Sequence, residues 1–355
     1  MGNRAAHGNP DDTNVQKTTD NSAKDEHEYD GSHVKIIHLQ LFGSVSTPVV
    51  STDSRNYYRL SIMSEEAICA IVLDYRGAEK TIECLLSLAR QGLNTVYVLD
   101  NSNLESYSTH LKHMLRSPPL TEMDYHLELL TAGRNLGFAK GVNFVLSHDR
   151  RSDRPHDYYL LLNNDALAGP SLVKGLLAAL KENPQAALVA PRIVSNDPGR
   201  EYGVWYHRYM GLLLSRPGTF RFHYFTGCCL MFPRNLVNNA NLLDESFFMY
   251  GEDAELGWRL TRLGKKMVCA KDVFVEHDFG PSVDRSSFFY EYHMTRGHLI
   301  LSRRTCLYPL EIPFLIITKY ATLLVRAIFR SVKRRTITPL TAWICAWFVI
   351  TTEPV

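Results

Sequence analysis

Three apolar runs, each ending on or beside an aspartate, limit most strongly what this chain can fold into. They are "AICAIVLD" at 67–74, "TVYVLDN" at 95–101 and "DYYLLLNND" at 157–165. A continuous apolar run of this length is typical of a strand buried on both faces of a parallel sheet. Because the carboxyl ends of parallel strands meet at one edge, Asp74, Asp100 and Asp165 are expected to lie along that edge.

Helical segments alternate with these strands. The segment 81–92, "TIECLLSLARQG", spaces its apolar residues as a helix does and closes with Gly92, a common helix stop. We also expect a strand at 126–132 and a helix at 139–149. The alternation predicts an α/β fold with a doubly wound mixed sheet and helices on both of its faces.

The charge and cysteine content exclude several classes of protein. Lys and Arg number 39 and Asp and Glu number 37, so no overall charge attracts nucleic acid. The seven cysteines are scattered without a C-x-x-C pair, which argues against a disulfide framework and a structural zinc site and favours a reducing, cytoplasmic compartment. Neither G-x-G-x-x-G after the first strand nor a P-loop occurs, which disfavours dehydrogenases and P-loop NTPases.

The three aspartates allow two interpretations. For any one of them, the preference of aspartate for turns is the simpler explanation. Three on one edge favour a ligand site, and a cluster of carboxylates repels a bare phosphate unless a cation lies between them. If the ligand is phosphorylated, the pattern therefore indicates a metal.

Seven motifs occur in the order in which family 2 glycosyltransferases carry them. They are "CAIVLDYRGAEKTIECLLSL", "VYVLDNS", "GRNLGFAKGVN", "YYLLLNNDA", "TGCCLMFPR", "LDESFFMYGEDAELGWRLTRLGKK" and "VFVEHDFGPS". Over about residues 67–305 the chain resembles this family and looks most like its rhamnosyltransferase-type branch. The resemblance implies a GT-A fold, in which one α/β domain binds a nucleotide-diphosphate sugar through a divalent metal and transfers the sugar with inversion.

The resemblance assigns roles to residues at the strand ends. Asp165, in "NND", matches the metal-binding carboxylate of the family's D-x-D motif, and Asn164 matches a position near the ribose. Asp100 matches a residue that reads the base, and Asp74 lies in the nucleotide loop of the first strand. In that loop the family usually has Thr-Tyr-Asn and this chain has Asp-Tyr-Arg, a departure that affects the choice of base. A dTDP- or UDP-linked sugar is the expected donor.

The stretch "GRNLGFAKGVN" at 133–143 supplies further residues. On its pattern alone it fits equally a glycine-rich nucleotide-binding segment and a flexible turn followed by a helix whose small residues allow close packing. The family's N-x-G-F-A-x-G-x-N stretch lies against the donor. The matching residues here are Arg134, Asn135, Gly137 and Asn143.

The segment 252–266, "EDAELGWRLTRLGKK", has the features of an amphipathic helix that stops at Gly264. Its apolar face is expected to hold Leu256, Leu260 and Leu263. Acids at a helix start are favoured by the helix dipole, which is the structural explanation of this motif. The resemblance instead gives Asp253, the last acid of "GED", the role of general base, with Glu252 in support.

His277 completes the predicted site. It follows an alternating strand, "VFVEHDFG", that ends in a Gly-Pro turn. A lone histidine is usually structural, but this one matches the histidine that completes metal binding in the family. Oxygen and imidazole ligands suit Mn²⁺, with Mg²⁺ as the alternative, better than Ca²⁺.

The strand and linker before the acidic helix carry no catalytic assignment. Cys228 and Cys229, in the predicted strand 225–234, are expected to be small packing residues. The segment 194–224 is rich in aromatics and arginine, which could stack on a sugar or contact an anionic carrier. We expect acceptor recognition there, although the same composition fits core and solvated surface.

The C-terminal segment is strongly apolar. Between 314 and 333 four cations recur at helical steps and form one basic stripe: Lys319, Arg326, Arg330 and Lys333. The stripe predicts a helix that lies on an anionic membrane surface, with Leu315, Leu323 and Phe329 entering the acyl boundary. Residues 336–352 are uncharged but short for a span, which favours a membrane-inserted hairpin or surface helix. The alternative is a helical subdomain that packs on the catalytic domain or on a second copy, as in a homo-oligomer.

These expectations define three parts. Residues 1–62 are polar without an apolar leader and are expected to be a largely disordered tail. Residues 63–305 are expected to form the GT-A domain, and 306–355 a C-terminal apolar helical extension. The chain is predicted to be a metal-dependent inverting glycosyltransferase that serves polysaccharide biosynthesis at the cytoplasmic face of a membrane, with a glycan or lipid-linked acceptor. The alternatives are a catalytically silent nucleotide-sugar binding module on the same fold and, less favoured, a nucleotidyltransferase.

Overall fold

The computed structural model describes residues 66–195, 201–237, 240–277 and 286–352. By its contacts the chain divides into two units, Met1–Leu60 and Ser61–Val355, and all described residues belong to the second unit. The tail predicted at 1–62 therefore lies outside the described residues.

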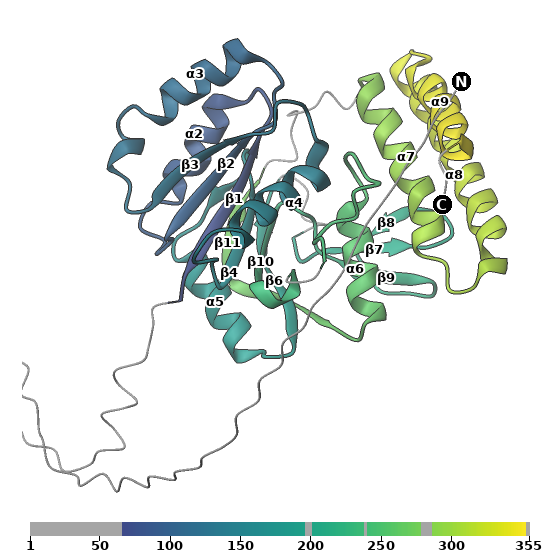
Figure 1. Ribbon diagram of the computed structural model, residues 1–355. Coiled ribbons are helices and arrows are strands. Elements are labelled where there is room, and N and C mark those ends of the chain that lie inside the picture. Colours follow the sequence, from purple (N-terminus) through teal and green to yellow (C-terminus); the bar gives the residue numbers. More distant parts are fainter. Residues whose placement is uncertain (1–65, 196–200, 238–239, 278–285, 353–355) are drawn as a thin grey trace, which may run out of the picture. The chain divides into compact units, whose positions relative to one another are not determined.

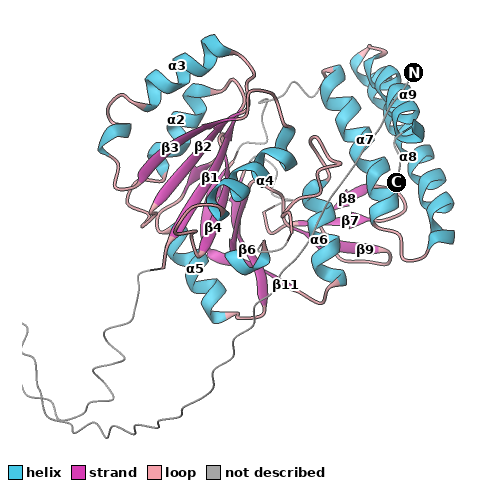
Figure 2. Ribbon diagram, in the orientation of Figure 1, coloured by secondary structure: helices cyan, strands magenta, loops and turns pink. Residues whose placement is uncertain are grey.

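Among the described residues, eight strands form one mixed sheet in the order β3-β2-β1-β4-β10-β6-β11-β5 (Figures 1 and 2). They are β1 (Ile68–Asp74), β2 (Thr95–Asp100), β3 (His126–Thr131), β4 (Tyr158–Asn163), β5 (Leu167–Ala168), β6 (Ala186–Val194), β10 (Cys229–Pro233) and β11 (Lys266–Glu276). Strands β3, β2, β1 and β4 are parallel to one another, β10 is antiparallel to β4 and β6, and β11 is parallel to β6. The predicted doubly wound mixed sheet is confirmed.

Helices cover both faces of this sheet, which explains the continuous apolar runs. Their bounds are α2 (Ala78–Ser87), α3 (Glu105–Leu115), α4 (Gly137–Arg150), α5 (Leu172–Glu182) and α6 (Glu252–Arg262), with short 3₁₀ turns at η1 (Leu120–Glu122) and η3 (Arg234–Leu236). In β1, Ala70 and Val72 pack with α2, α3 and α5, whereas Cys69 and Ile71 pack with α4 and α6. All four side chains are fully buried.

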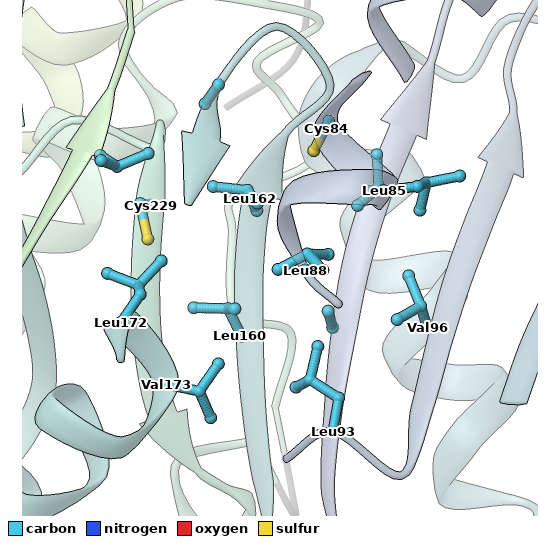
Figure 3. Packing of buried hydrophobic residues seen from close by; sticks show 14 of the residues in the cluster. Cys84, Leu85, Leu88, Leu93, Val96, Leu160, Leu162, Leu172, Val173 and Cys229 are labelled. Atoms are coloured by element: carbon cyan, nitrogen blue, oxygen red, sulfur yellow. The ribbon is translucent and has the colours of Figure 1, made fainter. Parts of the chain in front are cut away.

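The core between β4 and its helices is close-packed. Figure 3 shows Leu85 of α2 and Leu172 of α5 gathered around Leu160 and Leu162 of β4. Each of these leucines is fully buried. Fully burying one leucine stabilises the fold by about 1.5–3 kcal/mol, so this layer holds the carboxyl end of β4 firmly in place.

The end of α2 differs from the prediction. The helix spans Ala78–Ser87 and does not continue to Gly92. Arg90 has a φ of 60°, a left-handed conformation that no longer continues a right-handed helix. Gly92, with a φ of 76°, instead forms part of the turn into β2.

The end of α6 is partly as predicted. The helix stops just before Gly264, whose φ is 66°. Leu256 and Leu260 are buried, but Leu263 is 65% exposed. The prediction that Leu263 shares the buried face is wrong, because the chain has already left the helix at that residue.

A three-stranded sheet and a helical layer complete the described structure (Figure 2). The sheet, β8-β7-β9, comes from a segment in which the sequence predicts no strands. The bounds are β7 (Val204–His207), β8 (Leu212–Leu214), β9 (Arg221–Tyr224), α7 (Phe288–Arg304), η4 (Pro309–Glu311), α8 (Ile312–Arg334) and α9 (Thr338–Thr352). Tyr206 and Phe222 of this sheet pack with Leu301 of α7 and Leu323 of α8 in a third core.

The orientation of α8 contradicts the predicted basic stripe. Lys319 is fully buried, and Arg326 and Arg330 contact Glu291 of α7. Of the apolar residues expected to enter a membrane, Leu315 and Leu323 are buried. Of the four predicted cations only Lys333 is exposed. Arg326 and Arg330 turn inward because a buried carboxylate on α7 neutralises them, and sequence periodicity alone does not show such a partner.

Candidate active site

The carboxyl ends of β1, β2 and β4 meet at one edge of the eight-stranded sheet, as expected. Asp74 and Asp100 are opposite each other in the pairing of β1 with β2. Strand β4, on the other side of β1, leads into the turn that carries Asn164 and Asp165. The edge thus gathers three predicted carboxylates, but their side chains have different partners.

Asp165 and His277, 112 residues apart in sequence, lie in direct contact. The Oδ1 atom of Asp165 is 3.1 Å from Nε2 of His277. Strand pairing produces this contact, because β5 follows Asp165 closely and Leu167 of β5 pairs with Glu276 at the end of β11. The two side chains are 13% and 9% exposed, so the pair is shielded from bulk water but still reachable.

The pair offers one carboxylate oxygen and one imidazole nitrogen to a cation. Neighbouring ligands of an octahedral ion with bonds of ~2.1 Å lie about 3 Å apart, close to the observed separation of these atoms. Imidazole together with carboxylate is a donor set that Mn²⁺ accepts, whereas Mg²⁺ is bound chiefly by oxygen. The two residues therefore fit a divalent cation whose remaining ligands come from elsewhere.

Asp74 is engaged inside the fold. Its carboxylate accepts hydrogen bonds from Thr81 Oγ1 at 2.5 Å and from Tyr107 Oη at 2.6 Å. The side chain is fully buried, and this burial raises the pKa of Asp74, while the two hydrogen bonds oppose the rise. Asp74 thus ties the end of β1 to α2 and α3 and positions the loop that follows.

Asn164 belongs to the same network. Its Nδ2 donates to Thr81 Oγ1 at 3.0 Å, so Thr81 links Asn164 to Asp74. A Cβ at Gly77 would lie 3.2 Å from this amide nitrogen, so glycine there leaves the asparagine room. Thr81 escaped the sequence-based assignment because a threonine in a helix carries no pattern of its own.

Asp100 also holds nearby backbone. One carboxylate oxygen accepts from the backbone N–H of Ser102 at 2.8 Å, and the other accepts from the hydroxyl of Ser108 in α3. Asp100 is buried. It therefore shapes the loop after β2.

The glycine-rich stretch is clamped between β2 and the chain before α6. Asn101, missed in the sequence although it directly follows Asp100, accepts from the backbone N–H of Leu136 at 2.7 Å and donates to the carbonyl of Gly137 at 3.1 Å. Gly137 has a φ of 75°, and a Cβ there would lie 2.3 Å from the carbonyl oxygen of Phe248. Only glycine permits this approach.

A cavity of about 400 Å³ opens beside this contact. Its lining includes Arg134, Asn135, Lys140, Glu245, His293 and Arg296. Three of these side chains are cationic and one is acidic. Burial, and then Arg296, lowers the pKa of His293 to about 4, so this ring is neutral near pH 7. The cavity suits an anionic group such as a phosphate.

Asn143 is not in the lining of that cavity but contacts Glu245, which is. Its side-chain amide donates to the carbonyl of Leu243 at 2.8 Å and accepts from the backbone N–H of Leu243 at 3.2 Å. It also donates to Glu245 at 3.1 Å. Asn143 therefore holds the segment that leads into α6.

The entry into α6 is conformationally unusual. Tyr250 has a φ of 68° and Gly251 a φ of 104°. A Cβ at Gly297 of α7 would lie 2.1 Å from the carbonyl oxygen of Tyr250, so α7 packs directly on this turn. A strained turn fixed from outside in this way is typical of functional sites.

Glu252 and Asp253 start α6 and differ in environment. Asp253 is half-buried, and its Oδ1 accepts from the backbone N–H of Ala254 at 2.7 Å. Glu252 is buried, and its Oε2 has no hydrogen-bond partner among the described residues. Burial, and then the charge of Asp253, raises the pKa of Glu252 to about 8. Asp253 is therefore the better candidate for a charged base at neutral pH.

The cysteines are packing residues, as expected. Cys228 and Cys229 are buried, and burial raises the pKa of both thiols. A thiol with a raised pKa is a poor nucleophile.

Besides the pair Asp165 and His277, the described residues hold one group of three possible metal ligands, at the opposite edge of the sheet: Cys69, Asp149 and His156. The Asp149 carboxylate already accepts hydrogen bonds from Tyr97, Tyr159 and His156. All three residues of the group are buried. The group is therefore a hydrogen-bonded part of the core.

Known proteins similar to this chain support its place in one family. A family model described as glycosyltransferase like family 2 matches residues 67–298. N-acetylglucosaminyl-diphospho-decaprenol L-rhamnosyltransferases of two Mycobacterium tuberculosis strains are 26% identical over 229 residues, which cover 56% of this chain and 71% of each relative. The residues matched by the family model extend across the whole candidate site.

Two solved structures are similar to this chain. A crystal structure of GalNAc-T7 with UDP, GalNAc and Mn²⁺ has a TM-score of 0.50 and 13% identity, covering 72% of this chain and 54% of that one. Mannosyltransferase PcManGT from Pyrobaculum calidifontis, in complex with GDP-Man and Mn²⁺, has a TM-score of 0.49 and 15% identity, covering 84% and 94%. The GT-A fold predicted from the sequence is confirmed. The chain belongs to glycosyltransferase-like family 2 and is a glycosyltransferase.

Proposed function

We propose that this chain is a metal-dependent, inverting glycosyltransferase. It takes a sugar from a nucleotide diphosphate, with dTDP or UDP as the carrier, and transfers it to a hydroxyl group of a glycan or lipid-linked acceptor. The observation that carries the proposal is the contact of 3.1 Å between Asp165 and His277 at the carboxyl end of β4. In this proposal the two residues hold Mn²⁺ or Mg²⁺.

The residues of the edge have separate tasks in this proposal. A divalent ion, when bound by Asp165 and His277, neutralises the negative charge that grows on the departing diphosphate. The loops held by Asp74 and Asp100 receive the nucleoside, with Asn164 beside the ribose. Arg134 and Asn135 contact the donor from the cavity, because that cavity is cationic. Gly137 and Asn143 shape this wall, as their contacts indicate.

Asp253 acts as the general base, with Glu252 in support. An acceptor hydroxyl becomes a strong nucleophile only as its proton is removed, and inversion requires attack from the face opposite the leaving group. Asp253 lies on α6, whereas the proposed metal ligands follow β4 and β11. The two roles are thus carried by separate elements.

The names of the relatives support the proposed acceptor and location. Their name identifies an N-acetylglucosaminyl-diphospho-decaprenol rhamnosyltransferase, hence a lipid-linked acceptor and a rhamnosyl donor. We infer the same classes here, in the synthesis of a cell-surface polysaccharide. With such an acceptor, the enzyme is proposed to act as a peripheral protein at the cytoplasmic face of a membrane.

The test is donor binding by the variant Asp165→Ala with and without Mn²⁺. Loss of the carboxylate should remove the gain in affinity for a dTDP- or UDP-sugar that Mn²⁺ gives to the wild type, which we expect to be at least about tenfold, or ~1.4 kcal/mol. Calorimetric titration measures the affinity. Asp272→Ala, which removes an exposed carboxylate of β11, is the matched control and should keep the gain. A Mn²⁺ effect of equal size in Asp165→Ala and wild type would contradict the metal assignment.

A further inference from the structure

The outward face of α8 is a continuous apolar stripe. Its exposed positions recur at helical steps of three and four: Phe314, Ile317, Ala321, Val325, Ile328, Phe329 and Val332. Phe314, Ile317 and Val325 are 59%, 66% and 67% exposed. The helical stretch Pro309–Arg334 is long and apolar enough to cross a membrane, yet only 22% of its most apolar window is buried. A helix of a protein core would be mostly buried.

The charges of α8 point in the opposite direction. Arg326, Arg330 and Arg334 contact the buried carboxylate of Glu291 on α7 at 3.6, 2.6 and 3.1 Å. Lys319 is also buried. A helix on the surface of a soluble protein normally turns its charged face to water and its apolar face to the core. In α8 this arrangement is reversed.

Neighbouring residues extend the apolar surface and give it a cationic end. Leu310, just before α8, is 93% exposed, and α9 exposes Phe348. At the far end of α8, Lys333 and Arg335 are exposed. Apolar side chains with cations at their border match the layers of a membrane interface, where acyl chains lie below phosphate groups.

We propose that the apolar stripe of α8 docks into the interface of a lipid bilayer, with the helix lying along the membrane surface. The opposite face of α8 is bound to α7 through Glu291, so lipid cannot surround the helix as it surrounds a membrane span. Apolar side chains alone hold no polar atom that would fix the register of a second protein, whereas a fluid acyl layer needs no register. The proposal deepens the membrane location given under the proposed function.

The test is flotation of the full chain with phosphatidylcholine vesicles and with vesicles that also contain phosphatidylglycerol, at low and high salt. The variant carries Ile317→Gln, Val325→Gln and Phe329→Gln, and we expect it to bind both vesicle types at least about tenfold more weakly than wild type. Because the attraction is apolar, high salt should not release the wild type.

The matched control carries Leu86→Gln, Phe144→Gln and Leu263→Gln, three exposed apolar residues outside α8, and should bind as wild type does. Equal binding by wild type and the α8 variant would overturn the proposal. So would a wild type that ignores vesicles but forms a dimer that the α8 variant cannot form, since a second copy would then cover the stripe. Transfer to a soluble acceptor should be the same in all three proteins, and its absence from all of them would count against the proposed function alone.

Discussion

The edge of the large sheet and the C-terminal helical layer both bury carboxylates, but they stabilise them differently. At the edge, Asp74 is held by two hydroxyl groups and Asp100 by a hydroxyl and a backbone N–H. In the helical layer, Glu291 is surrounded by three arginines and Glu311 is paired with Arg208. Hydroxyl and backbone N–H donors are neutral, so the net negative charge around the carboxylate remains. Guanidinium groups are positive and cancel that charge.

The difference separates a functional region from a structural one. In the proposed function, the uncancelled negative charge at the sheet edge attracts a cation. Cancelled charge in the helical layer attracts nothing from solution and serves to lock α8 onto α7. If this distinction is correct, neutralising a carboxylate at the edge should impair chemistry, and neutralising one in the layer should impair stability.

The largest expected effect is that of Asp253→Asn on turnover. Removing a general base lowers the rate by about 10²–10⁴-fold, or ~3–5 kcal/mol in the barrier, while donor binding and thermal stability should remain close to wild type. Steady-state kinetics and donor titration on the same preparation make the comparison. Retention of more than about a tenth of wild-type turnover would show that another group takes the proton.

The next effect is that of Glu291→Gln on stability. The substitution leaves Arg326, Arg330 and Arg334 close together without a counter-charge, which should lower the free energy of unfolding by about 3 kcal/mol. Urea unfolding followed by circular dichroism measures the change. Glu128→Gln breaks a partly exposed pair with His148 and should cost less than about 1 kcal/mol. Equal losses in both variants would remove the contrast between the two regions.

The same contrast explains what could be predicted from the sequence. Strands β1, β2, β3 and β4 are predictable because their apolar residues form a local pattern in the sequence. The turn at Asp165 is predictable because it directly follows β4. The contact of Asp165 with His277 was implied by family resemblance alone, since it requires the pairing of β5 with β11. The roles of Thr81 and Tyr107 as partners of Asp74 carry no local pattern and could not be predicted.

The helical layer shows the limit more clearly. The period of α8 identified a row of cations, but it placed Leu315 and Leu323 on the opposite face, whereas both lie inside with Lys319 and only Phe329 is exposed. The orientation of the helix depends on Glu291, which is one acid among many in the sequence. Strands β7 and β9 were missed for a related reason: each is four residues long, and the packing of Tyr206 and Phe222 against distant helices defines them.

A smaller effect is expected for Glu252→Gln, measured as stability against pH. The pKa of Glu252 is raised to about 8 in the folded chain, whereas a glutamate in the unfolded chain titrates near 4.5. The stability contributed by its protonated form is present below about pH 4.5 and is lost as pH rises to about 8. The glutamine variant should not show this loss and should be more stable than wild type at pH 8 by about 2 kcal/mol.

Melting temperatures of wild type and variant, measured from about pH 5 to about pH 8, test this expectation, because in this range the unfolded chain loses the proton that the folded chain keeps. Glu245→Gln, at an exposed carboxylate that accepts hydrogen bonds from Asn143 and Asn241, is the control and should keep the pH dependence. Parallel curves for wild type and Glu252→Gln would mean that Glu252 ionises normally in the fold.

The smallest effect is expected for Lys319→Met, and its sign is the informative part. The Nζ atom of Lys319 is buried without a hydrogen-bond partner among the described residues and lies 5.2 Å from the ring centre of Tyr206. Burial, and then the charge of Arg208, lowers the pKa of Lys319, so the folded chain binds fewer protons than the unfolded chain and stability rises with pH towards the unfolded value. Methionine fills a similar volume without the cost of burying an amine, and it should raise the free energy of unfolding by about 1 kcal/mol at neutral pH, with a flatter pH dependence.

A cation–π contact with Tyr206 favours the charged amine, and in that case Lys319→Met would lower the free energy of unfolding. A loss of stability in Lys319→Met would therefore show that the ring of Tyr206 stabilises the buried lysine as a cation. The arginines of α8 are stabilised differently, by the carboxylate of Glu291.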